Sequence, residues 1–350
     1  MTQKKTGVII GADTHKRFHT IAVISETGQE LASRSFDAST KGYREALSYA
    51  EGFGAIHRAG VEATGSYGAG LSAYLKKEGI EVFDVYAPDK KRRRLVGKDN
   101  NKDAYQAAQA ALSYTRCAQA KDRSGDAEVL RLSESAYAQL VKQRTATINI
   151  LKATLVTLPD QMKACLQTLT TSALVKTTAA FRIVKGQDTF ESGAKKVLRS
   201  LAKTILALDS EIAALEKEIE THANALMPKT MSLLGVGCHS TVKFLNAAGE
   251  NIERMKGEAS FSMLCGVSPI PASTGDIYHH RLNRGGNRQA NSALYIMALT
   301  RIRTCEKTQA FIAKKMSEGK SKKDAIRVLK RYLAREVYAA LKEDLSLLTA

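Results

Sequence analysis

The sequence predicts an α/β domain followed by two helical regions. Residues 1–120 alternate strand patterns with helix patterns, which is typical of a mixed sheet covered by helices. Residues 121–227 form a helical region whose later part carries apolar side chains at heptad spacing, as in a coiled coil. Residues 228–350 end in an amphipathic helical pattern at 321–341 and are expected to form a mainly helical C-terminal domain.

The first three strands are predicted from apolar runs near the N-terminus. Val8–Ile10 and Ile21–Ile24 are β-branched and apolar, and six polar, basic or aromatic residues, THKRFH, connect them. This connection is short enough for a hairpin, although it lacks an Asn-Gly or Asp-Gly turn. Residues 30–38 alternate more weakly and are the third predicted strand.

The following elements alternate regularly. Helices are predicted at 40–53 with Thr40 as the cap, at 66–79 with Gly79 as the closing residue, and at 99–115. Strands are predicted at 55–63 and 81–86. The resulting order, β-β-β-α-β-α-β-α, is the pattern of the RNase H-like (RuvC-like) nuclease fold.

Acidic residues stand at the ends of the predicted elements. Asp13 ends the first strand, Glu62 ends the fourth, and Asp99 and Asp103 lie on one face of the helix that follows the fifth. The first and fourth strands are neighbours in this fold, so we expect Asp13 and Glu62 to meet. Each acid alone is best explained by a structural partner, whereas a cluster of carboxylates is typical of a Mg²⁺ site for phosphoryl transfer.

Charge and cysteine usage narrow the class of protein. The chain has 53 Lys and Arg against 35 Asp and Glu, a net charge of +18, which indicates a polyanionic partner such as nucleic acid. No segment approaches the ~20 apolar residues of a membrane-spanning helix, and no signal peptide is apparent. The five cysteines form no CxxC pair, which argues against a zinc site and favours reduced thiols in a cytoplasm.

A heptad stripe runs through the central region. Its seven apolar residues alternate spacings of three and four: Leu198, Leu201, Ile205, Leu208, Ile212, Leu215 and Ile219. This pattern predicts a coiled-coil seam. Two partners are open: another helix of the same chain, or the same helix in a second copy, which would make the protein a homo-oligomer.

The C-terminal region contains weaker signals for nucleic-acid binding. Residues 233–249 place Gly-x-Gly between two helical patterns, as in a helix-hairpin-helix, whose backbone N–H groups can bind a phosphate. Basic runs occur at 89–98 and 279–291, and each is either a phosphate-binding surface or a solvated basic face. The candidate phosphate ligands in these runs are Lys91, Arg92, Arg93, Arg94, Arg281, Arg284 and Arg288.

Several motifs together resemble a known family. DTHKRFHTIAVI (13–24), VEATGSYG (61–68) and KDNNKDA (98–104) resemble the acidic motifs of the DEDD transposases of the insertion-sequence "one-ten" family. SMLCGVSPIPASTG (262–275) followed by HRLNRGGNRQANSALY (280–295) resembles the C-terminal domain of that family. The resemblance implies a bacterial mobile-element recombinase with a RuvC-like domain, a coiled coil and a nucleophilic serine. It also implies a structured bridge RNA that pairs with donor and target DNA.

The resemblance implies roles for individual residues. Asp13, Glu62 and Asp103 match the first, second and last acids of the motif, but Asn100 stands where the third is expected. Asp99 is the nearest substitute, although one helical residue turns it by about 100°. The nucleophile position aligns with Thr274, and Ser273 precedes it. Ser273 is the better nucleophile, since the methyl group of threonine crowds in-line attack; the alternative for Ser273 is a structural role in a turn.

Three functional hypotheses remain open. The first is an RNA-guided recombinase that forms a covalent hydroxyl–DNA intermediate. The second is a junction resolvase or nuclease that uses the acids and Mg²⁺ without a covalent step. The third is a nucleic-acid-binding copy that has lost catalysis, which Asn100 and Thr274 favour. A sugar-kinase or actin-like ATPase shares the opening strand order but is disfavoured, because the sequence has no second glycine-rich phosphate loop.

Overall fold

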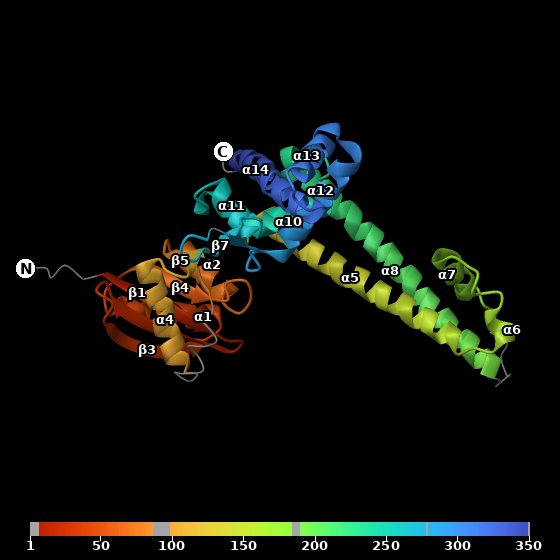
Figure 1. The fold of residues 1–350 in the computed structure, drawn as a ribbon. Helices are drawn as coiled ribbons and strands as arrows, with labels where there is room; N and C mark the ends of the chain where they lie inside the picture. Colours follow the sequence, from red (N-terminus) through yellow and green to blue (C-terminus); the bar gives the residue numbers. More distant parts are fainter. Residues whose placement is uncertain (1–6, 87–98, 184–189, 278, 349–350) are drawn as a thin grey trace, which may run out of the picture. The chain divides into compact units, whose positions relative to one another are not determined.

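The N-terminal unit is built on one mixed sheet. A computed structural model describes residues 7–86, 99–183, 190–277 and 279–348, and the chain divides into two compact units, Met1–Asp122 and Arg123–Ala350. The six strands of the first unit lie in the order β3-β2-β1-β4-β5-β6 (Figure 1). They are β1 (Gly7–Thr14), β2 (Phe18–Ser25), β3 (Glu30–Asp37), β4 (Ala55–Glu62), β5 (Glu81–Val85) and β6 (Cys117–Gln119).

The strand directions confirm the predicted α/β arrangement. The pairs β1–β2 and β2–β3 are antiparallel, which confirms the predicted hairpin. The pairs β1–β4 and β4–β5 are parallel. β6 was missed, since it has only three residues and depends on its pairing with β5 rather than on a pattern of its own.

Helices cover both faces of this sheet. Helices α1 (Thr40–Glu51) and α2 (Ala69–Lys77) share a core with Val8 and Ile10 of β1, whereas α4 (Asn100–Ser113) packs against Ile9, whose side chain points to the other face. All eight residues of β1 are buried, as expected for a central strand covered on both sides.

Helix caps differ slightly from the prediction. Ser39, not Thr40, is the N-cap of α1: its Oγ accepts a hydrogen bond from the N–H of Gly42 at 3.2 Å. Ser39 and Thr40 both carry a hydroxyl group that can cap a helix, so the sequence alone does not distinguish them. Gly79 follows α2 with a φ of +78°, in agreement with its predicted role as the closing residue.

The second unit begins with two long helices packed side by side, α5 (Gly125–Val156) and α8 (Phe190–Leu226) (Figure 1). The predicted heptad stripe lies along α8: Leu198, Ile205 and Ile219 are fully buried, and Ile212 is half-buried. At the far end of the pair, a small apolar core includes α7 (Thr171–Ala179), next to α6 (Asp160–Lys163). A helix of the same chain therefore packs against the predicted seam.

Shorter and later elements complete the second unit. They are α9 (Pro228–Met231), α10 (Cys238–Ala248), η1 (Ile252–Arg254), α11 (Glu258–Leu264), β7 (Ile270–Pro271), β8 (His280–Arg281), α12 (Arg288–Thr304), α13 (Glu306–Ser317) and α14 (Lys322–Leu348). Leu130 of α5 and Ile219 of α8 belong to the same core as α10, α12 and α14. The predicted division at 227/228 thus falls inside one compact unit, whereas the division at 120/121 lies within two residues of the observed boundary.

The Gly-x-Gly turn between α9 and α10 packs against α12. A Cβ atom on Gly235 would lie 3.1 Å from the carbonyl oxygen of Met297, and Arg301 donates from Nε to the carbonyl oxygen of Leu234 at 2.8 Å. The φ of Gly235 is +84°. Close packing and a left-handed backbone conformation therefore account for this glycine without a bound phosphate.

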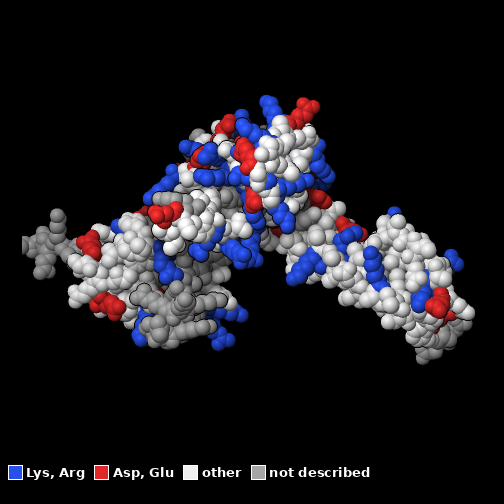
Figure 2. Space-filling view, in the orientation of Figure 1, with Lys and Arg blue, Asp and Glu red and all other residues white. Residues whose placement is uncertain are grey.

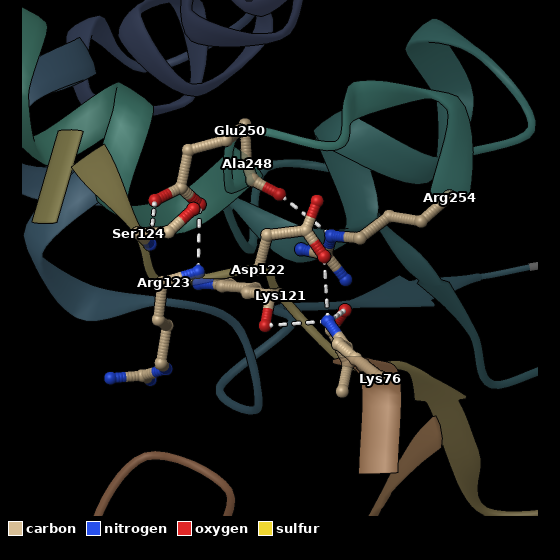
Figure 3. Close-up of polar contacts among 9 residues, drawn as sticks. Lys76, Lys121, Asp122, Arg123, Ser124, Ala248, Glu250 and Arg254 are labelled. Atoms are coloured by element: carbon tan, nitrogen blue, oxygen red, sulfur yellow. Dashed lines mark hydrogen bonds and ion pairs between the residues drawn. The ribbon is translucent and has the colours of Figure 1, made fainter. Parts of the chain in front are cut away.

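Each unit has its own polar anchor at the boundary, and Figure 3 shows both. In the first unit, Lys76 donates to the carbonyl oxygens of Ala120 and Lys121 and pairs with Asp122 at 2.7 Å. In the second unit, the carboxylate of Glu250 accepts from the backbone N–H groups of Arg123 and Ser124 at the start of α5, where a negative charge is favourable. Among the described residues, no helix is long and apolar enough to cross a membrane.

Candidate active site

Asp13 and Glu62 stand next to each other at one end of the sheet. In the parallel pair β1–β4, Ala12 lies opposite Val61, and Asp13 and Glu62 are the next residues along each strand. The hydroxyl of Thr14 donates to the carbonyl oxygen of Glu62 at 3.0 Å and ties the two strand ends together. Residues opposite each other in a parallel pair point to the same face, so both carboxylates lie on one face of the sheet.

Helix α4 covers that face at very short range. A Cβ atom on Gly11 would lie 2.1 Å from the carbonyl oxygen of Ala104, and one on Gly60 would lie 2.1 Å from that of Ala107. Glycine on the strands and alanine on the helix therefore let the backbone of α4 rest directly on the sheet. Gly11 and Gly60 each precede a candidate acid by two residues, so they share its face.

This close packing brings a third acid to the same face. Asp103 lies in the first turn of α4, one residue before Ala104, and its side chain is buried. Burial of an ionised carboxylate is costly unless it has partners, and Asp103 does have polar interactions. The predicted meeting of the first and fourth strands thus holds, and the helix predicted to carry the third acid packs over both.

Asp13 itself is buried and has a structural partner. His15 lies on the turn after β1, and its Nε2 is 3.1 Å from Oδ2 of Asp13. The side chain of His15 is 30% exposed, whereas Asp13 is almost fully covered. The sequence left two roles open for Asp13, a structural contact or a metal ligand. The His15 imidazole now occupies part of the hydrogen-bonding capacity of Oδ2, which is one of the two carboxylate oxygens of Asp13.

The carboxylates fit one mode of divalent-cation binding and not another. Among the described residues, no group of three or more His, Cys, Asp and Glu side chains is close enough together to hold a metal ion. Mg²⁺ in phosphoryl-transfer sites is commonly held by only one or two carboxylates, with waters and substrate phosphates completing its shell. The pair Asp13 and Glu62 fits that mode, whereas a cage made entirely of protein ligands does not.

Asp99 has a different position from the other acids. It is the N-cap of α4, its Oδ1 accepts from the N–H of Asn101 at 3.0 Å, and its side chain is exposed. Asn100, at the position of the expected third acid, is the first residue of the helix proper. Asp99 and Asp103 thus lie on the same helix turn but differ in exposure.

Ser273 and Thr274 lie on a β-hairpin in the second unit. Strands β7 and β8 pair Ile270 with Arg281, and Thr274 exchanges backbone hydrogen bonds with Ile277 at 3.2 Å. The two-residue turn begins with Gly275, whose φ of +57° is the positive value that the first position of a type I′ or II′ turn requires. Both hydroxyl residues are exposed near the tip. The sequence predicts only a loop here; Gly at the first turn position was the signal for a hairpin.

Comparison with known proteins agrees with this architecture. Residues 10–158 match a family model described as a transposase, of the IS110 DEDD type, and residues 228–313 match one described as "Transposase IS116/IS110/IS902 family". The chain belongs to the IS110 family of transposases.

Two curated relatives of this IS110-family chain were found. One is the insertion element IS900 uncharacterized 42 kDa protein of Mycobacterium paratuberculosis, 29% identical over 50% of this chain and 44% of that protein. The other is the insertion element IS110 uncharacterized 43.6 kDa protein of Streptomyces coelicolor, 26% identical over 42% of this chain and 37% of that protein. The match thus spans less than half the length of either relative.

The two family matches divide the candidate residues. The IS110 DEDD match includes Asp13, Glu62, Asp99 and Asp103, and the second match includes Ser273 and Thr274. The RuvC-like topology of the first unit fits the DEDD transposase class.

The basic candidates fall into two groups. Lys91, Arg92, Arg93 and Arg94 lie outside the described residues. Arg281, Arg284 and Arg288 are exposed and line adjoining hollows of the second unit. Gly286, in the same segment, packs on Gly266, where a Cβ atom would lie 2.3 Å from the backbone nitrogen.

Sequence reasoning missed two features of this region. The glycines at 11 and 60 carry no motif, and only pairing with the alanine stripe of α4 shows what they do. Several cations of α14 line the hollow beside β8, and the amphipathic pattern at 321–341 alone does not indicate this. The helical positions of the cations within 321–341, separated by face, were the available signal.

Proposed function

We propose that this IS110-family chain is the DNA transposase of a mobile element, which cuts and rejoins DNA strands by phosphoryl transfer dependent on a divalent cation, Mg²⁺. The observation that carries the proposal is the pair of carboxylates, Asp13 and Glu62, on neighbouring parallel strands under the helix that carries Asp103. Both family matches fall on the segments that hold the candidate residues.

In this proposal the acids hold the cation and the hairpin supplies the nucleophile. Asp13 and Glu62 would hold Mg²⁺, and Asp103 would add negative charge from the first turn of α4; Asp99 stays a candidate for the place of Asn100. When bound, the cation lowers the barrier by neutralising charge on the scissile phosphate. His15 orients the Asp13 carboxylate by its contact with Oδ2.

The covalent step is proposed for Ser273, with Thr274 as the alternative. The hydroxyl oxygen bonds to phosphorus as the bond from phosphorus to the 3′ oxygen breaks. The hydroxyl proton passes to solvent, and the leaving oxygen takes up a proton to give a free 3′-OH. The exposed hairpin tip supports this role, since the hydroxyls lie open to a large substrate. The ester conserves the energy of the broken bond for rejoining.

Partners follow from the family resemblance and the charge. The proposed substrates are donor and target DNA, and a structured bridge RNA is the proposed guide. A net charge of +18 supports polyanionic partners in general. The proposed place of action is the bacterial cytoplasm, in keeping with relatives from Mycobacterium and Streptomyces.

A covalent-adduct assay tests the function. Protein, flanking non-coding RNA, labelled donor and target DNA, and Mg²⁺ are mixed and separated under denaturing conditions. We expect a labelled protein band that disappears in Ser273→Ala and persists in Thr274→Ala. The reverse pattern would assign the nucleophile to Thr274, and cleavage without any adduct would contradict the covalent step.

A second candidate function is a RuvC-like resolvase or nuclease without a covalent intermediate. The acids of the first unit are sufficient for it. A third candidate is an impaired nucleic-acid-binding copy, which Asn100 at a motif position favours. Restoration of cleavage by Asn100→Asp in a chain that binds but does not cut DNA would support the impaired copy.

A homo-oligomer, a dimer or tetramer, is proposed to form through the long helices. Val129 and Leu132 of α5 and Leu206 of α8 are 40% to 55% exposed and are the apolar side chains that a second copy would cover. Light scattering is expected to give a multiple of 38.0 kDa for the wild type and a smaller mass for Leu132→Lys/Leu206→Lys. A monomeric wild type would contradict this proposal.

A further inference from the structure

A basic cleft lies beside the hairpin in the second unit. Its volume is about 770 Å³, within the range of ligand-binding clefts. One wall is β8 and the loop after it, with Arg281 and Arg284, and the other is α14, with Arg327 and Arg331. Seven of the lining side chains are Lys or Arg and only Asp324 is acidic. Figure 2 shows Lys and Arg gathered over this helical part of the chain.

The single acid cannot neutralise these cations. Asp324 already accepts from Arg327 at 2.5 Å and from the hydroxyl of Ser321 at 2.6 Å. Arg335 pairs with Glu258 at 3.1 Å. The remaining positive charge of the cleft repels itself, and an anionic ligand would relieve that repulsion.

Lys330 is one of the cations that line the cleft. Its Nζ donates to Oδ1 of Asn291 at 2.7 Å, and within the described residues no carboxylate pairs with it. Asn291 donates from Nδ2 to the carbonyl oxygens of Cys265 and Gly266, which fixes its oxygen toward the lysine. Burial, and secondarily the charge of Arg327, lower the pKa of Lys330, as expected for an ammonium group with no anion beside it.

An aromatic ring is exposed in the same cleft. Tyr332 is 48% exposed. Phe311 supports its ring edge-to-face, with ring centroids 5.6 Å apart, and the guanidinium of Arg335 lies over the ring at 5.6 Å from its centroid. Leu282, on the opposite wall, is 50% exposed. An exposed ring beside basic groups is the usual platform on which an unpaired base stacks. A duplex, whose bases are already stacked, offers no free face to it.

A second hollow with basic lining residues adjoins the cleft. It has a volume of about 400 Å³, shares Arg284, Asn291 and Lys330 with the cleft, and adds Arg288. Lys330 thus lines both hollows, and the arginines around them can bind phosphate groups.

We propose that this cleft binds an unpaired nucleic-acid strand, with a backbone phosphate on Lys330 and a base stacked on Tyr332. The identity of the natural ligand rests on the proposed function, whereas the binding of a single strand to the cleft does not. Arg281 pairs with Ile270, and Ser273 lies three residues further along the same chain segment, about 10 Å at ~3.3 Å per residue. The cleft therefore adjoins the hairpin that carries the candidate nucleophile.

Binding of a short strand to the full-length protein tests the proposal. Fluorescence anisotropy would follow a labelled twelve-nucleotide oligo-dT in EDTA, so that cleavage does not interfere. We expect Lys330→Met to raise Kd about tenfold and to lower the slope of log K against log salt by about 0.7, the value for one phosphate contact of a single strand. Tyr332→Leu should raise Kd by ~5-fold or more with an unchanged slope, and Tyr332→Phe should bind like the wild type.

Controls separate the site from general charge and from misfolding. Lys342→Met removes an exposed lysine from the same helix outside the cleft and should leave Kd within about twofold. Arg281→Gln, at an exposed position, should weaken binding even if Lys330→Met proves unstable in thermal unfolding. With 5-iodouracil in the strand, photo-crosslinks should map to the peptide that contains Tyr332.

Each outcome decides one part of the proposal. If the variants lose similar affinity for oligo-dT and oligo-U, the site recognises the phosphate and base that DNA and RNA share. If they lose affinity for only one of the two, that nucleic acid is the natural ligand. Tighter binding of duplex than of single strands, or unchanged Kd in both Lys330→Met and Arg281→Gln, would overturn the proposal. Lys330-dependent binding without any covalent adduct would leave the cleft standing and contradict the proposed function instead.

Discussion

Asp13→Asn and Glu62→Gln are each expected to reduce DNA strand cleavage by about 10³-fold or more. Each change removes one of the two carboxylates that stand together on β1 and β4. Loss of about 4 kcal/mol of transition-state stabilisation from a misplaced metal ion corresponds to a factor of ~10³. Cleavage of labelled donor DNA under single-turnover conditions in Mg²⁺ measures the effect.

Both variants are expected to keep the fold. The substitutions conserve shape, and the removal of one of two neighbouring negative charges relieves repulsion. Thermal unfolding should therefore show no loss of stability in Glu62→Gln. Cleavage within tenfold of the wild type in both folded variants would contradict the assignment of these acids.

Asp99→Asn tests whether Asp99 takes the place of the expected third acid. Asparagine and aspartate are equivalent N-caps, so α4 keeps its first-turn hydrogen bond to Asn101. Because the carboxylate is exposed and engaged in the cap, we expect cleavage close to that of the wild type. A loss as large as that of Asp13→Asn would instead assign Asp99 to the place of Asn100.

The meeting of the two strand-end acids was predictable because it depends on strand order alone. The apolar runs of β1 and β4 are strong local signals, and two neighbouring parallel strands bring their carboxyl ends to one edge. Asp13 and Glu62 could therefore be paired from the sequence once the order was assigned. The same reasoning placed Asp103 on a helix but could not show that this helix rests directly on the strands.

The features that were missed depend on contacts between distant segments. β6 exists only through its pairing with β5, and the basic cleft requires α14 to pack beside β8. None of these partners lies within a window in which periodicity or propensity can be measured. The heptad stripe illustrates the same limit: the pattern predicted a seam on α8, but its partner, α5, is a separate helix far earlier in the chain.

Gly11→Ala is expected to destabilise the first unit by about 3 kcal/mol or more. The new methyl group would lie 2.1 Å from the carbonyl oxygen of Ala104 and 2.2 Å from the backbone nitrogen of Ala108. Both contacts are backbone atoms of α4, so no side-chain rotation can relieve them. Overpacking of a core by one methyl group costs about 1–3 kcal/mol even when side chains can move. Here the helix itself must shift away from the sheet, and Asp103 with it.

Hydrogen exchange followed by mass spectrometry measures this effect in the full chain. Exchange of the β1 and α4 peptides should accelerate by more than ~100-fold, the factor that corresponds to about 3 kcal/mol. Gly52→Ala is the matched control: Gly52 ends α1 with a φ of −60°, and a Cβ atom there would approach the carbonyl oxygen of Tyr49 no closer than 3.2 Å. We expect a change within about 1 kcal/mol for it. Equal effects of the two substitutions would show that α4 does not rest on Gly11. Close packing of α4 on the sheet would then no longer explain the position of Asp103.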